Sequence, residues 1–324
     1  MPTSYINPSP SGETEGGRFS IIIPHKGPQW QLDRCVASVP KRDDLQIIVI
    51  HDEEGRGAGW ARNQGLSQAE GSYVIFADSD DYFHPCFNDF LDSIKEETAD
   101  VIYFNADSIA MESGKPSWRA NHLNRIMRSS DSVWQERHLR FHFTEPWCKA
   151  VRMSFIREHA IRFNESKILN DIYFSTQVGI FAKSIKVYTD KCYCVCNHSD
   201  STAKSKKAED RMLDYTRETA KSNLLLAKYG IKRYHSRMLR PMMSSMCHLR
   251  LRSAYRCWKE MRSCGYSIHT LLYYIIRYPR DLMKLIIRKA QAGEIKAPLH
   301  LTHTPMLSTS DFPRGGESSV SNNS

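Results

Sequence analysis

Short apolar segments alternate with amphipathic segments from Phe19 to about His198, and this alternation restricts the possible folds more than any other feature of the chain. The apolar segments in the first half cover residues 19–23, 45–50, 73–77 and 101–105. Residues 32–39, 60–69 and 85–97 lie between them and carry apolar side chains at helical spacing. The pattern predicts an α/β fold, in which helices flank a mostly parallel sheet.

Polar side chains follow three of these predicted strands. Pro24 and His25 come after the first strand, Asp52 after the second and the segment 78–81 after the third. In open α/β sheets, ligands bind outside the carboxyl ends of the strands. The sequence therefore predicts one ligand site built from these three strand ends.

The third strand end is strongly acidic, because Asp78, Asp80 and Asp81 follow the apolar run directly. Carboxylates this close repel one another, and near a core they stay ionised only if a cation or strong hydrogen-bond donors offset the charge. A hard divalent ion shared with a diphosphate would do so. The alternative is the start of a helix, with Asp81 as its N-cap and the other two carboxylates in water.

Several segments resemble, in order and spacing, the family 2 glycosyltransferases of the GT-A fold, which are inverting enzymes that use nucleotide-diphospho-sugars. The matching segments are residues 19–24, 32–39, 59–66 and 71–81, and the resemblance spans about 19–202. It implies a Rossmann-like, mostly parallel sheet flanked by helices, followed here by a helical C-terminal region.

The resemblance gives the acidic cluster a role as the family's Asp-x-Asp motif. Asp80 is the predicted direct ligand of Mn²⁺ or Mg²⁺, Asp78 faces the ribose or the metal, and Asp81 supports them. A divalent ion bridging the diphosphate oxygens acts as a Lewis acid on the leaving group.

The remaining contacts to the nucleotide are predicted at the same edge. Asp52 occupies the place of the family's base-recognising aspartate, where a carboxylate can accept a hydrogen bond from N3 of uracil; a plain turn residue is the alternative. Pro24 and His25 are predicted to border the sugar donor. Arg62 is predicted to bind the nucleotide or the acidic cluster, with a surface ion pair as the alternative.

Asp171 is the predicted catalytic base. Residues 161–165 and 169–174 resemble the family's Glu-Asp-x-x-Phe element, and inversion requires a base that deprotonates the acceptor hydroxyl as it attacks. The chain departs from the pattern at Asn170, where glutamate is usual. A helix N-cap is an alternative role for Asp171, and it does not exclude catalysis.

Three further features stay open between two interpretations. Trp147, in a segment similar to the family's Trp-x-Lys element, either stacks on a sugar ring or belongs to the core. His198 either contacts the diphosphate or is an ordinary loop residue. Cys192, Cys194 and Cys196 share one face of a strand and either form a zinc site with His198 or stay reduced, the second being favoured because zinc ribbons pair their cysteines on turns.

The chain also departs from the family after Asp52, since only residues 53–59 precede the Ala-Arg-Asn helix. Seven residues cannot hold the helix and strand that the family usually has there. An alternative function is therefore a catalytically degenerate relative that binds a nucleotide sugar or a partner without turnover.

Four regions are predicted along the chain: a disordered tail at 1–17, a GT-A domain at 18–202, a basic helical region at 203–302 and a second disordered tail at 303–324. The formal net charge is +9, and basic residues become frequent after Lys204. We expect an anionic membrane rather than nucleic acid as the partner, because no nucleic-acid recognition motif is present.

The segment 269–290 mixes aromatic and aliphatic residues with Lys and Arg, which is typical of a helix lying in a membrane interface. A helix packed on the catalytic domain is the alternative. No stretch reaches the roughly 18 apolar residues of a membrane span, and the first residues do not resemble a signal peptide. These features predict a cytoplasmic protein, peripheral on the inner face of the membrane, acting on a glycan or lipid-linked acceptor.

Overall fold

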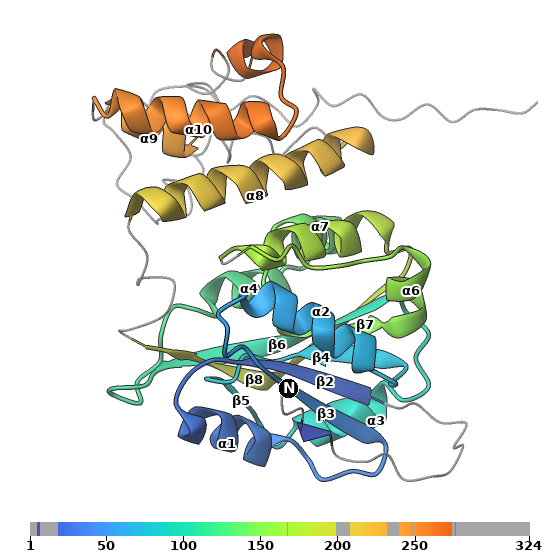
Figure 1. Ribbon diagram of the computed structural model, residues 1–324. Helices are drawn as coiled ribbons and strands as arrows, with labels where there is room; N and C mark the ends of the chain where they lie inside the picture. The colour runs from blue at the N-terminus through green and yellow to red at the C-terminus, as the bar shows by residue number, and fades with distance from the viewer. Residues whose placement is uncertain are drawn as a thin grey trace, which may run out of the picture. The chain divides into compact units, whose positions relative to one another are not determined.

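The computed structural model describes residues 5–6, 19–166, 168–198, 208–231, 240–247, 249–273 and 276. The chain divides into two compact units, residues 1–271 and 272–324. The first unit contains an α/β fold with helices on both faces of a sheet, as the sequence predicts (Figure 1). The boundary predicted near residue 202 stays a prediction.

Within the described residues the sheet has eight strands in the order β1-β3-β2-β4-β7-β6-β8-β5. The strands are β1 (Tyr5–Ile6), β2 (Phe19–His25), β3 (Leu45–His51), β4 (Tyr73–Phe76), β5 (Tyr82–Phe83), β6 (Val101–Ala110), β7 (Lys149–Arg152) and β8 (Ile185–Asn197). The centre β3-β2-β4 is parallel, as expected. The sheet as a whole is mixed, because β7 inserts antiparallel between β4 and β6 and because β1 and β5 add antiparallel edges.

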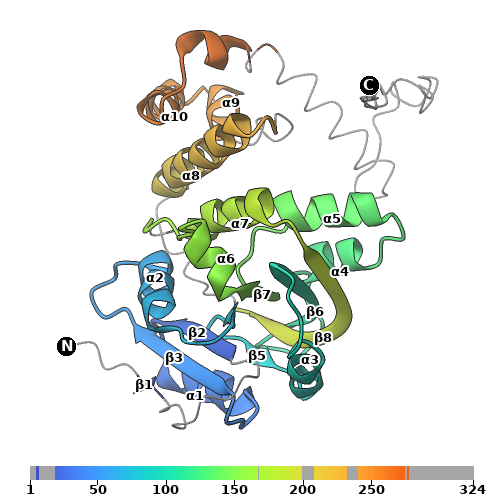
Figure 2. The ribbon, with the colours of Figure 1, turned by 90° about the vertical axis from the view of Figure 1, so that its right-hand side faces the viewer.

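Helices cover both faces of this sheet (Figures 1 and 2). One face carries α1 (Gln29–Ser38) and α3 (Phe87–Ser93), and the other carries α2 (Ala58–Gln68), α4 (Asn121–Met127), α6 (Met153–Glu158) and α7 (Asn170–Phe181). The helix α5 (Ser132–Phe141) packs against α7. Coverage on both sides explains why β4 is buried at every position and reads as a continuous apolar run.

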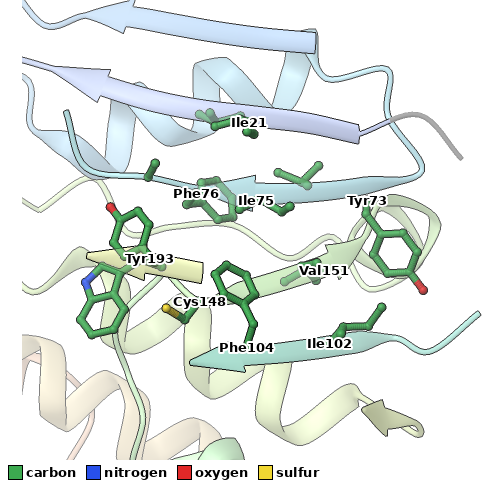
Figure 3. Close-up of a cluster of buried hydrophobic side chains, with 14 of the residues drawn as sticks. Ile21, Tyr73, Ile75, Phe76, Ile102, Phe104, Cys148, Val151 and Tyr193 are labelled. Carbon is green, nitrogen blue, oxygen red and sulfur yellow. The ribbon is translucent and has the colours of Figure 1, made fainter. Parts of the chain in front are cut away.

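The core lies between these strands and helices (Figure 3). Ile21, Phe76, Phe104 and Val151 are fully buried. Phe76 packs edge-on against two further rings. Phe163 lies in the segment before α7, and Phe174 lies on α7 itself. Burying side chains of this size contributes roughly 1.5–3 kcal/mol each, so the strand before the acidic cluster is firmly held.

Three helices follow in the C-terminal part of the first unit: α8 (Ala208–Lys228), α9 (Arg240–Cys247) and α10 (Leu251–Ser263). The helix α8 packs against α7, and Asn164 donates a hydrogen bond to Glu218 of α8. No helix among the described residues is long and apolar enough to cross a bilayer. The predicted helix at 269–290 is described as helical only at 268–273 and 276; its remainder lies outside the described residues, as does the predicted tail at 303–324.

Residues 5–6, within the segment 1–17 that composition predicts to be a tail, pair with β3 as the edge strand β1. The rest of that segment lies outside the described residues.

Candidate active site

Three adjacent strands end at one edge of the sheet, where the sequence predicts a ligand site. His25 and His51 are register partners at the ends of β2 and β3, and β4 pairs with β2 up to Phe76. Asp52 therefore follows β3, and the acidic segment follows β4, at the same edge. The structure brings these predicted positions together.

The carboxylates of Asp78, Asp80 and Asp81 form a compact cluster, with one oxygen of each lying within 4.8 Å of the others. Asp81 is 2% exposed, and both its oxygens are paired within the protein. Its Oδ2 accepts a hydrogen bond from the Tyr193 hydroxyl at 2.9 Å, and its Oδ1 accepts one from the Cys196 amide at 2.7 Å. Asp81 thus fixes the acidic turn to β8, and its role in a metal site stays a prediction.

Asp80 and Asp78 present the more accessible oxygens, with side chains 41% and 35% exposed. Burial, followed by the neighbouring charge of Asp78, raises the pKa of Asp80. The His198 imidazole lies near the Asp80 carboxylate, with its Nε2 3.8 Å from Oδ2 and without a hydrogen-bond partner. Oxygen ligands crowded in this way fit a hard divalent cation, which would relieve the repulsion between Asp78 and Asp80.

Arg62 connects the acidic cluster to α7. Its guanidinium donates to Asp78 Oδ1 at 2.6 Å through Nη2 and to Asn170 Oδ1 at 2.8 Å through Nη1. The Arg62 side chain is only 6% exposed and lies over the ring of Phe163. The buried ion pair with the acidic cluster is therefore the observed arrangement, and the surface-pair alternative is wrong.

Asp171 is the second residue of α7, whose N-cap is Leu169, so the N-cap alternative is wrong; it follows Asn170, which the Arg62 bridge ties to the acidic cluster. Burial raises the pKa of Asp171 to about 6, opposed by the positive charge of Arg62 and reinforced by the negative charge of Glu145. A carboxylate with this pKa is ionised at neutral pH and can still accept a proton efficiently. These are the properties needed in a general base.

Glu145 and Lys149 complete the surroundings of Asp171, and the sequence did not single them out as functional residues. Glu145 Oε2 is buried without a hydrogen-bond partner. Lys149 is 1% exposed and donates to the Phe143 carbonyl and the Ser175 hydroxyl, each at 3.0 Å, and also to the Glu145 carbonyl. Burial lowers the Lys149 pKa to about 8. The available signal was the resemblance of the segment 145–149 to the family's Trp-x-Lys element, in which only Trp147 was given a role.

Asp52 lies at the predicted edge but is engaged locally. It is 5% exposed, and its two carboxylate oxygens accept hydrogen bonds from the amides of Arg56 and Gly57 at 2.7 and 2.8 Å. The carboxylate thereby organises the short loop before α2, as the turn-residue alternative expects. Each oxygen retains a second lone pair, so recognition of a base by Asp52 stays a prediction.

Pro24 and His25 also lie at this edge. His25 is 5% exposed, its Nδ1 is buried without a partner, and burial next to His51 lowers its pKa. A neutral imidazole with an unpaired nitrogen can donate or accept one hydrogen bond. The predicted contact with the sugar donor remains a prediction for both residues.

Trp147 occupies the core. It is 3% exposed, its ring stacks against Tyr193 at a centroid distance of 6.0 Å, and it meets Phe143 edge-on. No face of the indole is open to a sugar in this conformation, so its position matches the core alternative. Tyr193, in turn, was missed: its hydroxyl accepts a hydrogen bond from the Asp78 amide and donates to Asp81. The alternation of β8 would have placed it opposite the cysteines, facing the cluster.

Comparisons with known proteins agree with this geometry. Residues 20–160 match the family model described as glycosyl transferase family 2. The uncharacterized glycosyltransferase YibD of Escherichia coli is 28% identical over 244 residues, covering 65% of this chain and 70% of YibD. The poly(ribitol-phosphate) β-N-acetylglucosaminyltransferase TarS of Staphylococcus aureus is 23% identical over 206 residues, covering 54% of this chain and 35% of TarS.

The fold is also found among solved structures. The crystal structure of residues 1–349 of S. aureus TarS in complex with UDP-GlcNAc aligns with a TM-score of 0.53 at 21% identity, covering 70% of this chain and 73% of that one. Residues 20–160 are therefore a glycosyl transferase family 2 domain, built on the GT-A fold.

Proposed function

We propose that this protein is a metal-dependent, inverting glycosyltransferase that moves a sugar from a UDP-linked donor to a glycan or lipid-linked acceptor in the synthesis of a cell-surface polysaccharide. The observation that carries the proposal is the bridge made by Arg62, which holds Asp78 and Asn170 within 2.6 and 2.8 Å of one guanidinium. It joins a candidate metal site to a candidate base in a single site.

The acidic cluster is the proposed binding site for the diphosphate and its cation. Mn²⁺ or Mg²⁺ held by Asp78 and Asp80 would supply charge stabilisation to the leaving diphosphate. Asp81, whose oxygens are already engaged by Tyr193 and Cys196, keeps the turn in place. Arg62 donates a hydrogen bond to the Asp78 carboxylate and places its positive charge beside that carboxylate.

Asp171 is the proposed base. The acceptor hydroxyl attacks the anomeric carbon from the side opposite the diphosphate, and its proton passes to the Asp171 carboxylate. A bond from the acceptor oxygen to the anomeric carbon forms as the bond to the phosphate oxygen breaks, so the configuration inverts and a nucleoside diphosphate leaves. The unpaired Glu145 Oε2 is a further acceptor for a sugar hydroxyl at this end of the site.

Membrane contact and a cytoplasmic location belong to the same proposal. The helix α10 exposes a face that mixes apolar and basic side chains, and Leu251 and Tyr255 are 66% and 60% exposed on it. Arg252, Arg256, Lys259 and Arg262 are exposed on the same helix. Such a face suits the interface of an anionic bilayer.

Calorimetric titration with nucleoside diphosphates and nucleotide sugars, UDP-GlcNAc among them, tests the donor site in the presence of Mn²⁺ and again with a chelator. We expect Mn²⁺-dependent binding of one nucleotide, abolished by Asp80→Ala and kept by Asp43→Ala, which removes an exposed carboxylate outside the cluster. Asp171→Asn is expected to keep binding and lose transfer.

The outcomes separate enzyme from binding protein. No nucleotide binding under either condition would mean that the short loop after Asp52 has removed the pocket, and the proposal would fail. Donor binding without transfer to any acceptor, equal in wild type and Asp171→Asn, would favour the degenerate relative that binds a nucleotide sugar without turnover.

A further inference from the structure

A second cluster of metal-ligating side chains lies on the other face of β8, outside the acidic cluster. It consists of His84, Asp107 and Cys194, and one ligand atom of each lies within 4.8 Å of the other two. His84 Nε2 and Asp107 Oδ1 are 2.9 Å apart. None of these residues has a part in the proposed glycosyl transfer.

Strand pairing explains why these three residues meet. Cys194 of β8 is the register partner of Asp107 on β6 and of Tyr82 on β5, and His84 follows β5 directly. The three side chains thus come from the three strands at one end of the sheet. Residues 82–84, 107 and 194 are distant in sequence, so only the folded sheet assembles them.

We propose that His84, Asp107 and Cys194 bind a transition-metal ion of the zinc class. An imidazole, a carboxylate and a thiol form a mixed donor set that suits Zn²⁺ or Co²⁺, and the thiol makes it a poor site for Mg²⁺. In this respect it differs from the all-oxygen cluster of Asp78, Asp80 and Asp81.

The observed spacing is close to that of a tetrahedral site. Ligand distances of about 2.0–2.3 Å from Zn²⁺ place the ligand atoms about 3.3–3.5 Å from one another. The separations here lie between 2.9 and 4.8 Å, so small rotations of the side chains suffice. The side chains of His84 and Asp107 are 27% and 40% exposed, which leaves a path for the ion and room for water as a fourth ligand.

Neighbouring residues support three protein ligands rather than four. Cys196 lies on the same face of β8 as Cys194, but its sulfur lies 3.4 Å from the guanidinium of Arg34. A fixed positive charge disfavours a cation there, so Cys196 is excluded from the set.

A metal at this position would hold the part of β8 that supports the acidic cluster. Tyr193 and Cys196, which flank Cys194, bond the two oxygens of Asp81. The ion would tie this segment to β5 and β6. Its role would be structural, acting on the transferase site through the position of Asp81.

Titration of the purified protein with Co²⁺, after treatment with a chelator and a thiol reductant, tests the site directly. Cobalt bound to a thiolate gives a near-ultraviolet charge-transfer band, which an all-carboxylate site cannot produce. We expect one equivalent of Co²⁺ to produce this band and Zn²⁺ to displace it. Asp80→Asn should leave the band unchanged.

Three variants remove a ligand and one serves as the control. We expect Cys194→Ser to abolish the band. His84→Gln and Asp107→Asn should weaken Co²⁺ binding by more than about ten-fold, because mutating a residue that only orients a metal ligand already lowers metal affinity by about that factor. Cys192→Ser should keep the band, because the Cys192 sulfur lies 3.9 Å from that of Cys86, in a separate thiol pair.

Thermal unfolding provides a second readout, in case one of the variants folds poorly. Zn²⁺ should raise the Tm of the wild type and of Cys192→Ser but not that of His84→Gln, because only protein with an intact site gains stability from the ligand. Absence of the band in the wild type, or its persistence in Cys194→Ser, would overturn the proposal. A band lost in Cys192→Ser would assign the metal to Cys86 and Cys192 instead.

Discussion

Arg62 illustrates how one side chain can define this site. Its guanidinium is buried, yet it has two acceptors on segments that are far apart in sequence, Asp78 after β4 and Asn170 at the start of α7. The family pattern has a glutamate at the position of Asn170. The amide oxygen of Asn170 accepts the arginine's hydrogen bond, so the acidic cluster is linked to the start of α7 without a carboxylate at this position.

We predict that Arg62→Ala destabilises the protein by about 1–3 kcal/mol, because it leaves Asp78 beside Asp80 without its neutralising partner. Arg56→Ala is the matched control: that arginine is 51% exposed and pairs with a glutamate that is 72% exposed. Exposed pairs of this kind contribute about 0–1 kcal/mol. Urea denaturation of both variants compares the free energies of unfolding, and equal losses would contradict the bridging role.

The raised pKa of Asp171 predicts a pH dependence with a definite sign. Its pKa is 3.8 in an unfolded chain and about 6 in the folded protein. The folded state therefore binds more protons between about pH 4 and pH 6, and stability falls as the pH rises through that window. The total cost at pH 7 is at most about 3 kcal/mol, at about 1.4 kcal/mol per pKa unit.

Asp171→Asn removes this cost, so the stability of the variant relative to wild type should increase from pH 4 to pH 6 and stay constant above pH 7. Denaturation at a series of pH values measures the difference, and Asp43→Asn, at an exposed carboxylate, should show no such trend. If the stability difference between Asp171→Asn and wild type did not change with pH, the ionised Asp171 carboxylate would not be destabilised by burial. In wild type, transfer activity should rise through about pH 6, where the base ionises.

Helix α2 approaches the segment before α7 closely because Gly59 has no side chain. A Cβ at Gly59 would lie 2.0 Å from the carbonyl oxygen of Asn164 and 2.7 Å from Cβ of Asn170. We predict that Gly59→Ala destabilises the protein by about 1–3 kcal/mol through this overpacking and displaces Asn170 from Arg62. Gly27→Ala is the control, since its Cβ would meet only the flexible end of Gln31, at 3.1 Å. Thermal unfolding and donor binding of the two variants should differ clearly.

Elements formed by local patterns were predictable, whereas those formed by distant pairing were not. The apolar runs at β2, β3 and β4 were enough to place His25, Asp52 and Asp78 at one edge of the sheet from sequence alone. The antiparallel insertion of β7 buries Lys149 within electrostatic reach of Asp171, and Trp147 lies in the core just before this strand; hydrophobic periodicity predicts neither placement. The bonds of Tyr193 to the acidic turn likewise depend on where β8 pairs, which periodicity cannot specify.

At the scale of the first compact unit, the helix α8 packs against α7, the helix that carries the proposed base Asp171. Glu218 of α8 has a side chain only 1% exposed and accepts a hydrogen bond from Asn164, in the segment that leads into α7. Phe181 of α7 also meets Tyr229 edge-on, just beyond α8. A surface that recruits a lipid-linked acceptor would therefore be attached to the side of the fold that carries Asp171.

The basic, partly apolar face of α10 predicts binding to anionic vesicles. Each basic residue near an anionic surface contributes about 1 kcal/mol, so Arg252→Glu with Lys259→Glu should weaken binding to such vesicles by roughly 30-fold or more. Lys41→Glu with Lys115→Glu makes the same change in net charge on exposed lysines of the α/β part and should have little effect. Vesicle sedimentation at physiological salt measures both pairs. Equal weakening by the two pairs would attribute binding to the net charge of +9 rather than to α10, and absence of wild-type binding would reject membrane contact.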